Sequence, residues 1–286
     1  MADRPNHSSD SVRQRLLNLA RDKGRVFDVV LVTYGLERLL YRLSMSGHRD
    51  SFVLKGGMLV ALWTGDENRV TRDADFLGYG DSSVERLKAV FSDIMSEPAD
   101  DGLVFDTKRL MAAAIRGEQQ YGGIRLKTIA ELGQTRIPIV VDVGFGDAVT
   151  TPDYTIEYPA LLDMPAASVR AYPPASVVAE KLHAIVTLGL VNSRMKDYYD
   201  LWALLNSRLI GTSELDDAIL ATFERRDTDL PADTPDGLTR RFSTDPFKVR
   251  QWSAYAASMG LDGLSLEQAV ESIWNLLGPA CQRLTD

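Results

Sequence analysis

The chain has 286 residues, a formal net charge of −8 and 45% hydrophobic residues. This composition is typical of a globular protein, and the acidic balance argues against a large non-specific nucleic-acid-binding surface. The single cysteine, Cys281, excludes an internal disulfide and is consistent with a reducing cytoplasm. The first ten residues lack the apolar core of a signal peptide, and no apolar run approaches the ~20 residues of a membrane span. We therefore expect a cytoplasmic protein with no membrane partner. A monomer is the default expectation, although no residue pattern determines the oligomeric state.

The first half of the chain mixes helical and strand patterns. Apolar residues at helical spacing predict a helix from about Ser11, where Ser11 and Gln14 have capping-box spacing, and a second helix over 27–45. A further helix is expected over 83–95. The expected strands are 72–77, 104–108, 124–129 and 136–145. This order predicts an α/β (α+β) fold with a mixed sheet.

The second half is predicted to be almost entirely helical. The expected helices are 176–190, 195–209, 214–226, 246–259 and 264–277, with an acidic, proline-containing loop over 227–236. We therefore expect two domains, an α/β domain over 1–165 that includes the N-terminal helices and a helical domain over 166–286.

Asp73 and Asp75 are the first candidates for chemistry. On a strand, residues two apart point to the same face, so Ala74 and Phe76 would face the core while both carboxylates face outward. Two adjacent carboxylates repel unless a cation or protons neutralise them, and Mg²⁺ prefers oxygen ligands of this kind. The alternative is a pair of solvated aspartates at a strand end, which this short pattern alone would favour.

Asp142 supplies a third carboxylate. It interrupts an apolar strand, where Ile139 and Val141 occupy the opposite face. An unpaired carboxylate in such a strand is unfavourable unless it meets solvent, a partner or a metal. A pair of aspartates with a third on a neighbouring strand is an arrangement suited to metal-dependent phosphoryl transfer.

Other polar residues lie before and after these aspartates. A glycine pair, Gly56-Gly57 after Lys55, lets backbone amides approach a phosphate, although most glycine pairs form turns. Lys181 lies on a partly apolar helical stripe, so it is either a surface-reaching lysine or a phosphate ligand. The segment 194–201 opens a helix with a dense polar cluster that suits either salt bridges or nucleotide binding; its charged members are Arg194, Lys196, Asp197 and Asp200.

In this order and spacing, the motifs resemble the AbiEii/AbiGii nucleotidyltransferase toxins, the group that includes the mycobacterial MenT toxins. The resemblance covers about 52–205. It implies a DNA polymerase β-like nucleotidyltransferase core and a toxin of a toxin–antitoxin or phage-defence system with a cognate antitoxin. It also implies Mg²⁺ or Mn²⁺ as cofactor, an NTP as co-substrate and, as in some MenT proteins, the 3′ acceptor end of tRNA as acceptor.

Carried over by position, the resemblance assigns roles to individual residues. Asp73 and Asp75 match the metal-binding motif, with Asp142 as the third metal ligand. Lys181 matches the NTP-contacting lysine. Asp200, favoured over Asp197, matches the final acidic motif. Lys55, Gly56, Gly57, Arg194, Lys196 and Asp197 would assist in nucleotide binding. The candidate RNA contacts are Lys108, Arg109, Arg116, Arg125, Lys127, Arg194 and Lys196.

Three other functions fit the same residues. The chain could modify a protein or a small molecule such as an aminoglycoside, which suits the acidic net charge. It could bind nucleotide or antitoxin without catalysis, or it could be a metal-dependent nuclease. The molecule that becomes labelled, and whether RNA is lengthened or shortened, distinguishes these alternatives.

Overall fold

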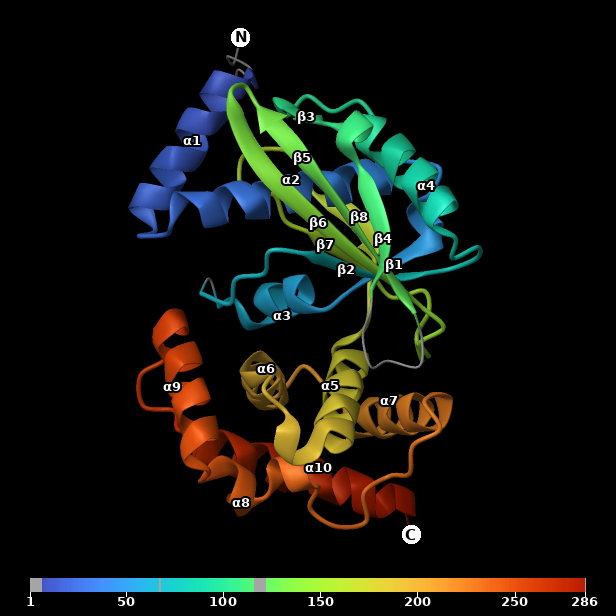
Figure 1. Cartoon of the computed structure of the whole chain (residues 1–286), viewed down its shortest axis with the longest axis vertical. Coiled ribbons are helices and arrows are strands. Elements are labelled where there is room, and N and C mark those ends of the chain that lie inside the picture. Colours follow the sequence, from blue (N-terminus) through green and yellow to red (C-terminus); the bar gives the residue numbers. More distant parts are fainter. Residues whose placement is uncertain (1–6, 67, 116–121, 286) are drawn as a thin grey trace. The chain divides into compact units, whose positions relative to one another are not determined.

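The computed structural model describes residues 7–66, 68–115 and 122–285, and the chain divides into two compact units (Figure 1). The first unit is built from 1–59, 70–146 and 153–171, and the second from 60–69, 147–152 and 172–286. The main division thus falls after residue 171, whereas the sequence analysis placed its boundary after residue 165. Two short segments that precede this division, 60–69 and 147–152, belong to the second unit, so a single boundary along the sequence does not describe the two units.

A six-stranded sheet forms the centre of the first unit. Its order is β1-β2-β6-β5-β3, and β4 also pairs with β5. The strands are β1 (Phe52–Lys55), β2 (Ala74–Gly78), β3 (Leu103–Phe105), β4 (Met111–Ile115), β5 (Gly123–Leu132) and β6 (Thr135–Phe145). β2 and β6 run parallel, and the other neighbouring strands run antiparallel. The predicted mixed sheet is therefore confirmed.

Helices pack against this sheet and against one another. The helices are α1 (Ser9–Asp22), α2 (Phe27–Met45) and α4 (Val84–Ser96). In Figure 1, α2 crosses behind β5 and β6. The approach is close, because a Cβ added to Gly35 of α2 would lie 2.7 Å from Cδ1 of Ile139. The expected capping by Ser11 is wrong, because α1 already begins at Ser9 and Ser11 lies inside the helix.

The alternation of β6 decides which face of the sheet is open. Ile137, Ile139, Val141 and Val143 are at most 1% exposed, so they form part of the core beneath the sheet. Asp142 points to the other face and remains partly exposed. This division of faces is the one that the sequence predicts, since successive strand residues point in opposite directions.

Two short strands that the sequence analysis did not predict lie beside β1. They are β7 (Thr155–Tyr158) and β8 (Ala167–Arg170), which pair antiparallel as a separate two-stranded sheet. An isolated bridge from Leu54 to Ala171 places this sheet next to β1. Each strand has four residues, which is too short for a clear period-two pattern. Between β1 and β2, α3 (Gly57–Thr64) leads from the first unit into the second.

The second unit is helical, as predicted. Its α-helices are α5 (Pro174–Leu188), α6 (Met195–Asn206), α7 (Thr212–Arg225), α8 (Arg240–Ser243), α9 (Pro246–Met259) and α10 (Leu266–Thr285). α5 packs against α6 and α7, and α10 also contacts both. α5 and α9 each begin with a proline, which suits the first helical position because no backbone N–H is needed there.

Among the described residues, one helical segment is long and apolar enough to be a candidate membrane span. It is Pro174–Val191, and 44% of it is buried inside the protein. A single segment of this kind is weak evidence for a membrane helix, because core helices satisfy the same length and hydropathy criterion.

Candidate active site

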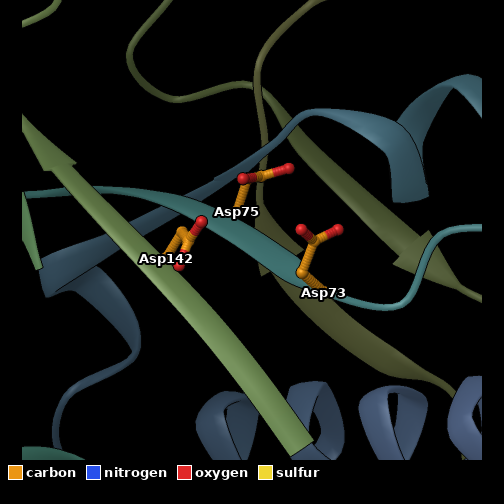
Figure 2. A group of neighbouring side chains, drawn as sticks. All are labelled: Asp73, Asp75 and Asp142. Carbon is orange, nitrogen blue, oxygen red and sulfur yellow. The ribbon is translucent and has the colours of Figure 1, made fainter. Parts of the chain in front are cut away.

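Three aspartates gather on the open face of the first unit's sheet. Asp73 directly precedes β2, Asp75 lies within it, and Asp142 lies opposite Asp75 on the parallel strand β6. One carboxylate oxygen from each residue lies within 4.8 Å of the others, and all three side chains are partly buried. Figure 2 shows the carboxylates on the same side of the two strands. The structure thus brings together the three residues that the sequence analysis selected as metal ligands.

The donor set suits a hard divalent cation. Three carboxylates converge without a histidine or cysteine, and oxygen-only ligands favour Mg²⁺ or Mn²⁺ over softer metals. Without a cation, three negative charges this close repel one another. The site therefore fits a hard divalent cation of the kind that the sequence analysis expected.

Asp73 is oriented by a neighbouring hydroxyl. Oγ1 of Thr71 donates a hydrogen bond of 2.7 Å to Oδ1 of Asp73. A hydroxyl two residues before an aspartate is a short-range arrangement that could be found in the sequence. The sequence analysis did not select Thr71, so it is an addition to the site.

Asp75 lies against the backbone of Gly56. Gly56 has φ of +76°, in the left-handed region, and a Cβ added there would collide with the carboxylate oxygen Oδ2 and lie 2.9 Å from Cγ of Asp75. Lys55, the last residue of β1, is the register partner of Asp75, and Gly57 begins α3. Gly56 therefore leaves the space that the Asp75 carboxylate occupies. The predicted contact of Lys55, Gly56 and Gly57 with nucleotide phosphates stays a prediction.

Replacement of Gly56 by alanine should reduce nucleotide transfer roughly 100-fold, because an added Cβ displaces Asp75 and a shift of about 1 Å in an active site has an effect of that size. The left-handed backbone should also cost about 1–3 kcal/mol of stability. Transfer rate and chemical unfolding are the two measurements. Gly24→Ala is the matched control, because Gly24 has φ of +61° with no atom near the added Cβ. Equal transfer by the two variants would show that Gly56 does not position Asp75.

Asp142 is held by an arginine from the adjacent strand. Nε of Arg125 lies 2.7 Å from Oδ1 of Asp142, and its second nitrogen lies 2.5 Å from Oδ2. This hydrogen bonding raises the pKa of Arg125 above its ordinary value. The sequence analysis selected Arg125 only as an RNA contact, whereas the structure makes it the partner of a predicted metal ligand.

The other predicted RNA contacts of the first unit that lie among the described residues are exposed. Lys127 follows Arg125 on the same face of β5, and Lys108 and Arg109 lie in the short turn before β4. Arg109 also forms an ion pair with Asp106 at 3.3 Å. Arg116 lies outside the described residues.

A second cluster of predicted site residues forms an ion-pair network in the second unit. Nζ of Lys181 lies 2.7 Å from a carboxylate oxygen of both Asp197 and Asp200. Arg69 donates two hydrogen bonds to Asp200 at 2.6 and 2.8 Å, and Arg194 lies 2.6 Å from Asp197. The two aspartates are fully buried, and the Lys181 side chain is 12% exposed. The salt-bridge alternative for the polar segment is therefore present for Arg194 and Asp197, while Lys196 is exposed.

The charges within this network stabilise one another. Burial alone would raise the pKa of Asp200, but Lys181 and Arg69 outweigh burial and lower it. Burial likewise opposes the charged form of Lys181, while Asp200 and Asp197 raise its pKa. Arg69 lies 131 residues before Asp200, so no local sequence signal could have identified the pair. The roles of Lys181, Asp197 and Asp200 in nucleotide binding stay predictions.

His183, which the sequence analysis assigned to packing or the surface, belongs to a separate buried cluster. Its Nδ1 lies 3.2 Å from a guanidinium nitrogen of Arg226, and its Nε2 lies 3.0 Å from the Thr228 hydroxyl. Because arginine can only donate, Nδ1 accepts, and Nε2 carries the proton. Arg226 is also paired with Asp147 and Glu180 at 3.0 Å. Burial, followed by the positive charge of Arg226, lowers the pKa of His183 to about 4.

Stability should therefore fall on mild acidification. The folded-state pKa of His183 lies below its ordinary value of 6.5, so the unfolded chain binds more protons between about pH 4 and 6.5. Its contribution is complete above pH 6.5 and is lost as the pH falls, by up to about 2 kcal/mol at pH 5. Urea unfolding of the wild type and of His183→Gln at pH 7.5 and pH 5 measures the effect. An equal loss of stability in both proteins would exclude His183 as its source.

One protein family and two solved structures are similar to this chain. A family model described as "Nucleotidyl transferase AbiEii toxin, Type IV TA system" matches residues 38–275. No curated protein matches the chain. Two solved structures from Helicobacter pylori, a provisionally assigned nucleotidyltransferase and the protein JHP933, are each 14% identical to it. The alignments cover 88% of this chain and 94% of the first structure at a TM-score of 0.46, and 89% and 93% at 0.47 for the second.

Proposed function

The chain belongs to the AbiEii nucleotidyl transferase toxin family, and we propose that it transfers a nucleotide from an NTP to the 3′ end of tRNA in a Mg²⁺-dependent reaction. As a member, it is a nucleotidyltransferase of toxin–antitoxin type. The observation that carries the proposal is the convergence of Asp73, Asp75 and Asp142 within 4.8 Å on two adjacent strands. A MenT-like role, inhibition of translation, a cytoplasmic location and phage defence are part of the proposal.

The chemistry divides among named residues. Asp73, Asp75 and Asp142 would hold the divalent cation, which when bound supplies positive charge to the triphosphate. The RNA 3′ oxygen forms a bond to the α-phosphorus, the bond from that phosphorus to the bridging oxygen breaks, and pyrophosphate leaves with the electron pair. In this scheme Asp142 orients the 3′ hydroxyl and accepts its proton. Lys181 would neutralise charge on the triphosphate, as the family resemblance implies.

The acceptor side of the proposal rests on exposed cations near the triad. Arg125 contacts Asp142 directly, and Lys127 lies two residues further along β5 on the same face. Lysine and arginine side chains contact nucleic-acid phosphates without reading sequence. A local basic group of this kind is compatible with an overall charge of −8, because charges in solution are screened over about 8 Å at physiological salt.

The test is incubation of the purified protein with Mg²⁺, total tRNA and each α-³²P-labelled NTP in turn. We expect label on tRNA from one or two of the NTPs, none with EDTA, and none from the corresponding γ-labelled NTP. Periodate-oxidised tRNA, which lacks an intact 3′ terminal diol, serves as the matched acceptor control and should remain unlabelled. Label on a protein or on a member of a small-molecule panel would show that the acceptor is not tRNA. Shortened RNA would indicate a nuclease.

A further inference from the structure

Four charged residues form one row across the sheet of the first unit. The strand registers place Lys55 opposite Asp75, Asp75 opposite Asp142, and Asp142 opposite Arg125. Residues directly opposite on neighbouring strands have Cβ atoms about 5 Å apart. The row therefore has two carboxylates at its centre and one cation at each end. A cation therefore lies on each side of the two carboxylates that are expected to bind the metal.

Arg125 is hydrogen-bonded to the two oxygens of Asp142 through which a metal would bind. Both carboxylate oxygens of Asp142 accept a hydrogen bond from the same guanidinium, at 2.7 and 2.5 Å. A cation bound through Asp142 must share or take one of these oxygens, and the guanidinium charge repels it. Arginine does not lose its proton in proteins, so this repulsion is relieved only when the side chain moves away.

The environment of Arg125 allows that movement. Its side chain is 43% exposed, whereas Asp142 is 15% exposed. The cation is thus the mobile partner of the pair, and the carboxylate is the fixed one. A guanidinium released from a carboxylate keeps its two-pronged donor geometry, which matches phosphate oxygens as well as carboxylate oxygens.

We propose that Arg125 is an exchangeable counter-ion, which holds Asp142 while the metal site is empty, leaves it when a divalent cation binds, and then contacts a phosphate of the bound NTP. This inference rests on the proposed function, since it requires the triad to bind the cation and the NTP to be the donor. It gives Arg125 a role in coupling metal binding to nucleotide binding.

The first experiment tests metal binding. Mn²⁺ alone is titrated into metal-free, full-length protein, and free Mn²⁺ is measured by electron paramagnetic resonance. Arg125→Gln removes the competing charge and should bind Mn²⁺ about tenfold more tightly than the wild type. Arg136→Gln is the matched control, since Arg136 is an exposed arginine on β6, six residues and about 20 Å from Asp142. Its Mn²⁺ affinity should stay within twofold of the wild type. Far-UV circular dichroism verifies that both variants are folded.

The second experiment tests nucleotide binding by measuring the rate of nucleotide transfer at saturating Mn²⁺. Arg125→Gln should raise the KM for NTP at least tenfold, and Arg125→Lys, which keeps the charge without the two-pronged geometry, should lie between that variant and the wild type. Tighter Mn²⁺ binding together with a raised KM supports the exchange. Unchanged or weaker Mn²⁺ binding, or an unchanged KM, overturns it. Asp75→Asn identifies the other kind of failure, because Mn²⁺ binding unaffected by that change would remove the proposed function itself.

Discussion

Replacement of Asp75 by asparagine should lower nucleotide transfer by about three orders of magnitude or more. The change removes one of three converging carboxylates while preserving size and shape. Metal ions supply several kcal/mol of transition-state stabilisation, and each ~1.4 kcal/mol corresponds to a factor of ten in rate. The measurement is the single-turnover rate of label transfer at saturating Mg²⁺ and NTP.

Folding should be much less sensitive to this change than activity. Removal of one charge relieves repulsion within the triad but also weakens the attraction to the neighbouring cations Lys55 and Arg125, so the free energy of unfolding should stay within about 1 kcal/mol of the wild-type value. Asp93→Asn is the matched control, because Asp93 is an aspartate of α4 that is 72% exposed and lies outside the triad. Transfer by Asp75→Asn above a tenth of the wild-type rate would contradict a central role for this carboxylate.

Most of the triad could be predicted from local pattern. Asp75 and Asp142 each follow a buried strand residue, Ala74 and Val141, and period-two alternation fixed the face to which both aspartates point. The parallel pairing of β2 with β6, which places Asp75 opposite Asp142, was not itself predicted. Instead, the expectation that the two strands would be neighbours came from the chemistry of three carboxylates and from the family resemblance.

The partners of these aspartates were harder to predict, although one pair had a readable signal. β5 and β6 are joined by a two-residue turn, Gly133 and Gln134, and such a turn fixes the register of a hairpin. Arg125 and Asp142 are equally far from that turn, so recognition of the hairpin would have placed them opposite each other. Gly56 offered no such signal, because its contact with Asp75 depends on the left-handed turn after β1.

The network around Asp200 shows what a family resemblance does not supply. The resemblance assigned Asp200 to an acidic motif, but it named no partner. The structure shows Asp200 fully buried, with one arginine and one lysine bonded to its carboxylate. A carboxylate that is fully buried and paired with two cations has no surface through which it could contact a substrate. We therefore expect Asp200 to act on Lys181, whose contact with the triphosphate is part of the proposed function, rather than on the reacting atoms.

Replacement of Asp200 by alanine should lower the free energy of unfolding by about 3–5 kcal/mol, because the change leaves the charges of Arg69 and Lys181 buried and under-compensated. Urea unfolding at pH 7.5 measures this loss. Asp216→Ala is the matched control in the same unit, since Asp216 also pairs with an arginine, Arg283, but that arginine is 46% exposed. Exposed pairs contribute up to about 1 kcal/mol. A loss in Asp200→Ala no larger than that of Asp216→Ala would show that the buried network does not stabilise the fold.

The milder change Asp200→Asn separates a positioning role from a catalytic one, because it keeps the size and one hydrogen-bond acceptor of the side chain. If Asp200 works by holding Lys181, the KM for NTP should rise in Asp200→Asn. The double variant with Lys181→Met should then transfer nucleotide no more slowly than Lys181→Met alone, since residues that act through one contact have non-additive effects. A fall in kcat at unchanged KM, with losses that multiply in the double variant, would instead place Asp200 at the reacting atoms.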